Sequence, residues 1–414
     1  MQHAVEQADA VYQQISHITV LLDAFNARHA ALIHEAQQEP SDKHTQSPRQ
    51  LDCSKEFMHM RTPTIPVLPR ETIHLVFSFV DSREDLSNLA LASRALHSIA
   101  TSVLYRSLSL EKPRESILCL RTLSRDLRLP TLVRSFEIRW TWTKPSANLH
   151  QLVHRVLERM TLLTSLSIEV HADFHPWKLN ECTFSLTRFS SSSRCDTSLV
   201  EFLEKQSNIE DLTLRGFNSD PSEFTFRSSS FNLNPNPVPF PISDTALPKL
   251  SRLRAIHAGP ATVSRLIDGR PLKQVSMPLY ADCVHRSLDA LELSSARIER
   301  LNVISFDPEA PDYLLGEIAK RLPDLEALHV VILLAQSSEA ALINSSPALR
   351  NFKSLQYLTY MSATNLGSIS QENEAKIAEE WHKSCPTLKT IILPMGKVWF
   401  YDNTRWSCLK EQEG

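Results

Sequence analysis

The chain has 414 residues, of which 42% are hydrophobic and 22% charged, and its formal net charge is -3. This length suits two or three domains, and the composition is typical of a globular protein. The charge argues against the basic surface of a nucleic-acid-binding protein. Only seven glycines occur, none closer than ten residues to another, which excludes a glycine-rich nucleotide-binding loop.

No segment near the start has the pattern of a membrane span or a secretory signal. The longest apolar run there is ITVLL, at residues 18–22, whereas about 20 residues are needed to cross a bilayer. The seven cysteines are scattered and never spaced as Cys-x-x-Cys, which favours reduced thiols. We therefore expect an intracellular protein, cytoplasmic or nuclear, that contacts no membrane.

Residues 1–36 are predicted to form one amphipathic helix. Its apolar positions, from Ala8 to Leu32, follow one another in steps of three and four. The length also allows a short coiled coil, and both interpretations remain open. Residues 37–61 contain almost no large apolar side chains, so they are expected to be a solvated polar linker.

Residues 62–108 are predicted to form a small module of three helices. Pro69 and Glu71 suit the first turn of a helix. A second helix is expected from about residue 84 to 94, and a third around residues 96–105. The apolar stripe of the first helix consists of Ile73, Val76, Phe77 and Val80. A module of about forty residues is rarely stable alone, so part of its apolar surface should face another protein.

This module resembles an F-box. The resemblance rests on Leu68-Pro69-x-Glu71, on Asp85-Leu86 and on Leu89-x-Leu91-Ala92-Ser93-Arg94. Ala92-Ser93-Arg94 and Leu104-Tyr105-Arg106 depart from the usual pattern in a way similar to the F-box proteins of mushroom-forming fungi. The resemblance implies docking on the Skp-type adaptor of a cullin–RING (SCF-type) ubiquitin ligase. The residues implied at or near that contact are Leu68, Pro69, Ile73, Phe77, Leu86 and Leu89, each of which could alternatively be core of the module.

A phrase of the form Leu-x-x-Leu-x-Leu recurs eight times after residue 160, often preceded by a helical pattern. Such a unit cannot bury its apolar face alone, so copies must stack. We therefore predict an irregular leucine-rich-repeat solenoid, an α/β repeat, over residues 109–395, with a loop at 218–244 and a C-terminal tail at 396–414. The alternative is an ordinary α/β domain. The copies are LLTSLSI (162–168), NIEDLTL (208–214), PKLSRLRAI (248–256), PLKQVSM (271–277), RIERLNV (297–303), PDLEALHV (323–330), KSLQYLTY (353–360) and PTLKTIIL (386–393), with TLVRSFEI from Thr131 as a worn first copy.

In such a solenoid, the residues between the inward leucines line the concave surface, where a protein substrate would bind. The alternative for each position is a solvated sheet surface without a partner. The candidate substrate-binding residues are Asp211, Thr213, Arg215, Arg300, Asn302, His329, Tyr357 and Thr359.

No catalytic, metal or cofactor motif is found. His171 and His175 are four residues apart but lie in a segment expected to be a loop, and Cys385 near His382 is expected to be a buried thiol. We therefore expect a non-catalytic substrate-recognition subunit that binds an adaptor and, through it, cullin and RING subunits. The alternative is a repeat scaffold whose F-box serves a complex that is not a ligase. Nucleic acid is not an expected partner, and the substrate protein is unknown.

Overall fold

The computed structural model describes residues 68–140, 146–170, 179–216, 225–227, 230–232, 240–336, 338–363, 371–394, 396–402 and 404–408. The helix predicted at residues 1–36 and the linker at 37–61 lie outside these residues. The chain divides into two compact units, Met1–Asp81 and Ser82–Gly414. The module predicted at residues 62–108 therefore spans the boundary between the two units.

The described part of the first unit contains helix α2, Arg70–Ser78. Pro69 is its N-cap, one position before the expected first turn, and the Pro69 carbonyl accepts a hydrogen bond from the Ile73 amide at 3.1 Å. Glu71 lies in the first turn, where the helix dipole favours a carboxylate. The helix ends in a tightened turn in which the Phe79 amide donates to the Val76 carbonyl.

The second unit begins with helices α3, Arg83–Ala92, and α4, Arg94–Leu104. Ser93 separates them in an extended conformation, and its hydroxyl accepts from the Leu96 amide. A serine suits this corner because its side chain caps the start of a helix. The Arg83 guanidinium donates to the Ser107 carbonyl at 3.0 Å, which ties α3 to the first strand of the sheet.

A single open sheet of 13 strands occupies the rest of the second unit. Its strand order follows the chain order, and the first eleven strands are parallel. They are β1 (Ser107–Leu110), β2 (Ser135–Trp140), β3 (Ser165–Val170), β4 (Arg188–Ser191), β5 (Asp211–Leu214), β8 (Arg252–Ala255), β9 (Gln274–Leu279), β10 (Arg300–Ser305), β11 (Ala327–Gln336), β12 (Tyr357–Ala363) and β13 (Thr390–Ile392). Within the expected loop at 218–244, β6 (Thr225–Arg227) and β7 (Ser230–Asn232) form a separate antiparallel pair.

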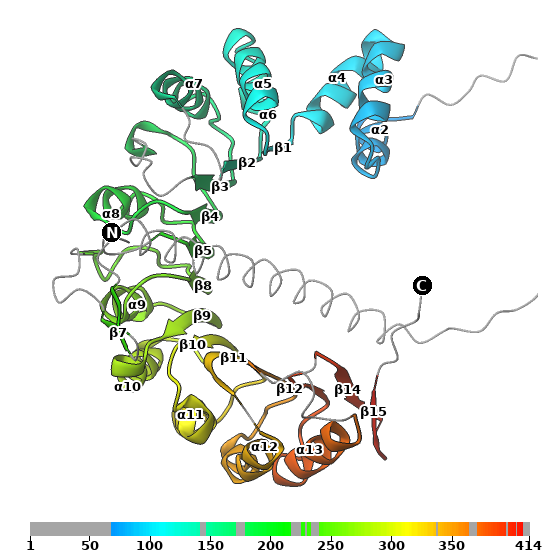
Figure 1. Ribbon diagram of the computed structural model, residues 1–414. Helices are drawn as coiled ribbons and strands as arrows, with labels where there is room; N and C mark the ends of the chain where they lie inside the picture. The colour runs from blue at the N-terminus through cyan, green and yellow to red at the C-terminus, as the bar shows by residue number, and fades with distance from the viewer. Residues whose placement is uncertain are drawn as a thin grey trace, which may run out of the picture. The chain divides into compact units, whose positions relative to one another are not determined.

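The helices that follow the strands lie on one side of the sheet (Figure 1). They are α5 (Pro113–Arg125), α6 (Leu129–Leu132), α7 (Ala147–Leu157), η1 (Leu179–Glu181), α8 (Thr197–Glu204), α9 (Pro260–Ile267), η3 (Ala281–Cys283), α10 (Val284–Asp289), η4 (Ala290–Leu293), α11 (Ala310–Arg321), α12 (Glu339–Asn344), η5 (Ser346–Asn351) and α13 (Gln371–Ser384). None of the helices in the described part of the chain has the length and apolar composition needed to span a bilayer.

The recurring leucine phrase forms the core between sheet and helices. Every copy identified in the sequence coincides with a strand. In the copy at residues 208–214, which contains β5, Ile209, Leu212 and Leu214 are fully buried. The alternation of buried and more exposed side chains along β2, β3 and β10 shows that only one face of these strands packs on helices. β1 and β4 were not identified, because β1 lies in the F-box resemblance and β4 carries Phe189 and Ser191 in place of leucines.

Successive strands are joined by the same backbone contact. The Arg134 carbonyl accepts hydrogen bonds from both the Thr164 and Ser165 amides, at 2.9 and 3.0 Å. The Glu299 carbonyl accepts in the same way from Glu326 and Ala327, at 2.9 and 3.1 Å. Because the contact recurs from β1 to β13, each strand–helix segment docks on its predecessor in an equivalent register.

The segment set apart as a tail from residue 396 contributes two strands to the sheet. β14 (Val398–Tyr401) and β15 (Trp406–Cys408) pair antiparallel beyond β13. The buried Trp399 indole donates to the Glu374 carboxylate of α13 at 3.2 Å. The antiparallel hairpin thus ends the parallel array and closes the core over its last helix.

Candidate adaptor-binding and partner-binding surfaces

The predicted substrate-binding residues lie in rows on the sheet face opposite the helices. Arg300, Ala327 and Tyr357 are register partners on β10, β11 and β12. Asn302, His329 and Thr359 form the next row in the same way. Asp211, Thr213 and Arg215 belong to β5 or follow it directly, and β8 and β9 separate them from the other two rows.

Exposure divides these eight residues. Arg300 is exposed, and Arg215, Asn302 and Tyr357 are half-buried. The other four are buried, and therefore present little surface to a partner: they are Asp211, Thr213, His329 and Thr359. All eight lie on one face of the sheet, but the sequence pattern carried no signal for the depth at which each lies.

Charged side chains on this face form cross-strand pairs in its N-terminal half. Arg139 contacts Glu111, which follows β1, at 3.2 Å and Glu137 of its own strand at 2.6 Å, and the hydrogen bond that Arg139 donates to Glu137 raises the pKa of Arg139. Arg215 contacts Glu169 at 3.0 Å. In the C-terminal half, Ile304, Val331 and Met361 form one apolar row across β10, β11 and β12.

Burial shifts the pKa values of two cysteines and of His257 away from neutral pH. Burial raises the pKa of the Cys195 thiol to about 12, with a smaller contribution from Asp196. Burial, assisted by Glu158 and Glu181, also raises the pKa of Cys182 to about 12. Burial and the nearby Arg215 lower the pKa of His257 to about 3. The two thiols are therefore protonated near pH 7, and the low pKa of His257 keeps its imidazole neutral there.

His382 and Cys385 do not form a nucleophile–base pair. The His382 ring stacks on Tyr401, with ring centroids 4.0 Å apart, and lies edge-on to Trp406. The Cys385 thiol contacts the Thr387 hydroxyl at 3.3 Å, and burial raises its pKa. Both side chains therefore pack within the last repeat, as expected for Cys385.

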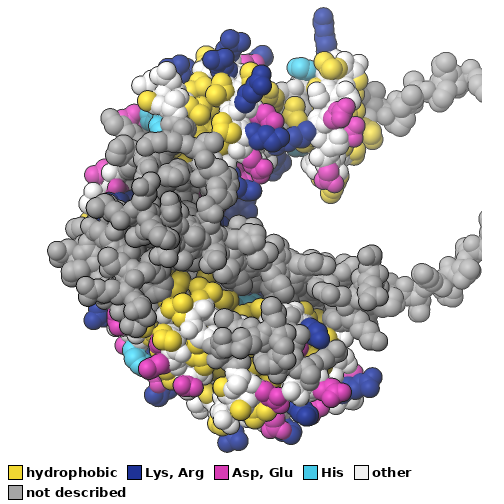
Figure 2. Space-filling view, in the orientation of Figure 1, with side chains coloured by type: hydrophobic (Ala, Val, Ile, Leu, Met, Phe, Trp, Pro, Cys, Tyr) yellow, Lys and Arg dark blue, Asp and Glu magenta, His cyan; other side chains and the backbone are white. Residues whose placement is uncertain are grey.

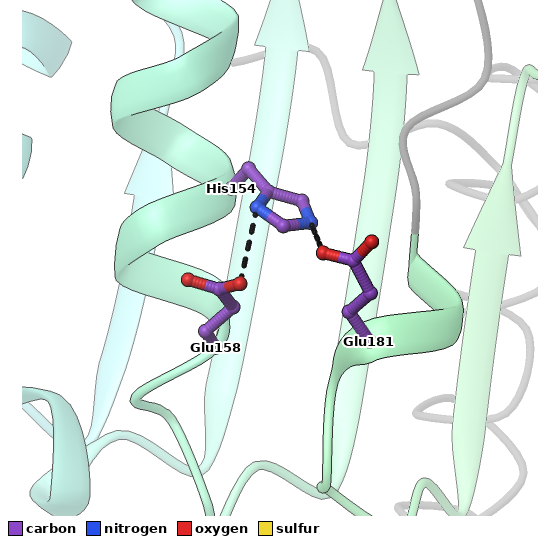
Figure 3. A group of neighbouring side chains, drawn as sticks. All are labelled: His154, Glu158 and Glu181. Carbon is purple, nitrogen blue, oxygen red and sulfur yellow. Dashed lines mark ion pairs between the residues drawn. The ribbon is translucent and has the colours of Figure 1, made fainter.

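One group of side chains has the composition of a metal site. His154 of α7 lies between Glu158, 3.5 Å from its Nδ1, and Glu181 of η1, 3.6 Å from its Nε2 (Figure 3). Their ligand atoms lie within 4.8 Å of one another. Imidazole and carboxylate suit zinc or another divalent transition metal. Both carboxylates are exposed, and without a metal the same contacts simply join α7 to η1 at the protein surface.

Helix α2 has apolar side chains on two faces. Phe77 is only 7% exposed, and Ile73 is half-buried. Leu75, Val76 and Phe79 point away from Ile73 and Phe77 and are 58%, 53% and 77% exposed. Phe79, at the C-cap, lies one helical turn from Leu75 and Val76, so the three side chains share one stripe. A nine-residue helix with one buried and one exposed apolar face has the form of an interface element.

Helix α3 of the second unit shows the same contrast on a smaller scale. Leu86 is buried, whereas Leu91 is 80% exposed. Leu89 and Ala90 are intermediate. A leucine this exposed on a short helix adds to the apolar surface available to a partner.

Residues 65–111 match the F-box-like family. The chain contains an F-box-like domain. The match covers α2, α3, α4 and β1, and it indicates binding to a Skp-type adaptor of an SCF-type complex. No curated protein matches the chain.

The residues predicted to contact the adaptor are distributed between surface and core of the F-box-like domain. Leu68 and Pro69 are exposed, Ile73 and Leu89 are half-buried, and Phe77 and Leu86 are buried. The sequence analysis did not select the exposed leucines and phenylalanine at positions 75, 79 and 91 as contacts. Their spacing on α2 was available as a signal, but spacing alone does not tell which of two apolar stripes is covered.

Proposed function

We propose that this protein is the substrate-recognition subunit of an SCF-type ubiquitin ligase. The observation that carries the proposal is the exposed apolar stripe of α2 within the F-box-like domain. In this proposal, Leu75, Val76 and Phe79 contact the Skp-type adaptor together with Leu68 and Pro69, while Phe77 and Leu86 maintain the fold of the domain. The adaptor connects the protein to cullin and RING subunits.

The energetics support an interface on this stripe. Burying a leucine, valine or phenylalanine side chain fully is worth roughly 1.5–3 kcal/mol. Three such residues are more than half exposed on α2, so a partner that covers them gains several times the energy of one contact. Aromatic side chains such as Phe79 are also enriched at protein interfaces.

The repeat region is proposed as the substrate-binding part. A parallel sheet whose strand order follows the chain, with helices on one side, supports a leucine-rich-repeat solenoid. The sheet face opposite the helices then takes the substrate protein, with the exposed Arg300 and the half-buried Arg215, Asn302 and Tyr357 in contact. The protein contributes proximity and no catalytic group, and we place it in the cytoplasm or nucleus. The F-box variant is proposed to be of the type found in mushroom-forming fungi.

The test is co-purification of the full chain with a Skp-type adaptor. The variant L75S/V76S/F79S removes the exposed stripe, and we expect it to lose most of the adaptor. The control variant L118S/L127S/L334S removes three leucines of the repeat region that are similarly exposed. We expect it to bind as the unmodified chain does. Equal adaptor binding by both variants would sink the proposal.

The same experiment separates a ligase subunit from a scaffold. If cullin and RING subunits join the adaptor complex, the protein acts in a ligase. If the adaptor binds and no cullin follows, the F-box-like domain serves another complex. The first outcome is expected.

A further inference from the structure

The sheet face opposite the helices carries arginines at a regular interval. Arg188 of β4, Arg252 of β8 and Arg300 of β10 are exposed. They belong to one row, because Arg188 pairs in register with Asp211, Asp211 with Arg252, Arg252 with Gln274, and Gln274 with Arg300. An arginine therefore occupies every second strand of this part of the sheet.

Positive charge exceeds negative charge along these strands. From β4 to β10 the face carries five arginines, including Arg215 and Arg254, against the two carboxylates of Asp211 and the adjoining Glu169. Asp211 contacts Arg252 at 3.4 Å and Glu169 contacts Arg215 at 3.0 Å. Among the described residues, no carboxylate lies within ion-pair distance of Arg188 or Arg300. The row is thus positive in a chain whose net charge is -3.

The rim beside the row does not cancel this charge. Glu299, just before β10, contacts Lys273 at 3.5 Å. Glu210, just before β5, is exposed and adds one negative charge. Lys and Arg side chains are visible on this side of the sheet next to β2–β4 (Figure 2).

The spacing of the arginines matches a polypeptide in the polyproline II conformation. Neighbouring strands lie about 4.8 Å apart, so arginines on alternate strands lie roughly 10 Å apart. A polyproline II segment has three residues per turn and rises about 3.1 Å per residue, so one turn covers nearly the same distance and places positions i, i+3 and i+6 on one face. Acidic side chains at every third position of a segment that crosses the strands would each meet one arginine.

We propose that the Arg188–Arg252–Arg300 row binds an acidic segment of a protein with carboxylates at positions i, i+3 and i+6. This proposal rests on the proposed function, because it names the chemistry of the substrate that the repeat region takes. Charge complementarity identifies the occupant, and guanidinium–carboxylate hydrogen bonds fix its register. Gln274, between two of the arginines, offers an amide for the peptide backbone.

The test measures binding of two fluorescent decapeptides to the full chain by anisotropy at low salt. Both consist of glutamine and serine with three glutamates, spaced at every third position in one and contiguous in the other. We expect the spaced peptide to bind several-fold more tightly. The variant R188S/R252S/R300S should weaken its binding about tenfold, since three exposed ion pairs together approach one decade in affinity. Added salt should weaken it as well.

The control variant R125S/R155S/R286S makes the same change in net charge with exposed arginines of α5, α7 and α10. It should bind the spaced peptide like the unmodified chain. A second variant, R188E/R300E, should bind a spaced lysine peptide instead, which shows that the face is intact. Equal binding of the spaced and contiguous peptides, or equal loss in the control variant, would overturn the proposal. So would a single-stranded oligonucleotide that binds more tightly than the spaced peptide.

The outcome is separable from that of the adaptor test. R188S/R252S/R300S leaves α2 unchanged and should retain the adaptor, while L75S/V76S/F79S should retain the spaced peptide. Loss of the adaptor in the arginine variant would show that the row serves the adaptor and would overturn its assignment to a substrate.

Discussion

The F-box-like domain and the repeat region differ in how completely they bury their apolar side chains. In the repeats, each leucine phrase is covered by its own helix and by the neighbouring copies, so that Leu212, Leu253 and Leu301 have no exposed surface. In α2, a second stripe of large apolar side chains stays exposed. Stacking supplies a partner for every repeat within the chain, whereas a short helical module must find one elsewhere. In the proposed function, the repeat region is therefore the scaffold and α2 the docking element.

The largest effect on the free energy of unfolding in the repeat region is expected at a buried arginine. Arg270 is 2% exposed, and its guanidinium donates to the carbonyls of Ala246, Arg265, Asp268 and Ser243 at 2.6–3.0 Å. The variant R270M leaves these carbonyls without that donor, so unfolding should become easier by about 2–4 kcal/mol. Urea denaturation measures this change.

Arg265 is the matched control for Arg270. Its side chain is exposed and lies near Asp244, so R265M should change the free energy of unfolding by less than about 0.5 kcal/mol. Similar losses of stability in R270M and R265M would show that the four hydrogen bonds of the Arg270 guanidinium do not stabilise the fold.

A smaller effect is expected at the surface of the repeats. Hydrogen bonds from Arg321 and Lys320 lower the pKa of Glu317 to about 2, below the value of about 4.3 in an unfolded chain. Stabilisation by Glu317 is therefore present above pH 4.3 and is lost as the pH falls toward 2. Lys320 is exposed, so solvent screens its share of this interaction, whereas Arg321 and Glu317 are 14% and 19% exposed.

The variant E317Q tests this dependence. Its difference in stability from the unmodified chain should shrink as the pH is lowered from 5 to 2, as measured by thermal unfolding at each pH. A difference that stays constant across this range would exclude the ionised Glu317 as its source.

The smallest effect on stability is expected for F79S on α2, and its contrast with F77S sharpens the comparison most. Phe79 is 77% exposed and Phe77 is 7% exposed, two residues apart on one helix. The variant F79S should leave the melting temperature of the isolated protein nearly unchanged, since surface substitutions fall within about 0.5 kcal/mol. F77S should lower it clearly, because a buried aromatic ring is lost. A large loss in F79S would place this ring in the core and remove it from the interface.

Much of the repeat region could be predicted from local pattern. The leucine phrase located nine of the eleven parallel strands, because inward positions at fixed spacing leave a signal in each copy. It failed at β4, where Phe189 and Ser191 fill the inward positions, and at β1. The strands β14 and β15 were not predicted either, since Trp399 and Trp406 are buried only through contacts with a distant helix. The burial of Arg270 has no local signal, because two of its carbonyl partners, Ser243 and Ala246, lie more than twenty residues away in the sequence.

The sequence by itself determined the helices of the F-box-like domain, the resemblance confirmed for residues 65–111, and the face of the sheet on which each side chain lies. These features depend on neighbours within a few positions, where periods of 2 and 3.6 residues fix the direction of each side chain. Only the tertiary structure decided that Phe77 is covered while Phe79 is exposed, and that three arginines from distant repeats share one row. Coverage and row membership depend on the register between elements, which no single stretch of the chain contains.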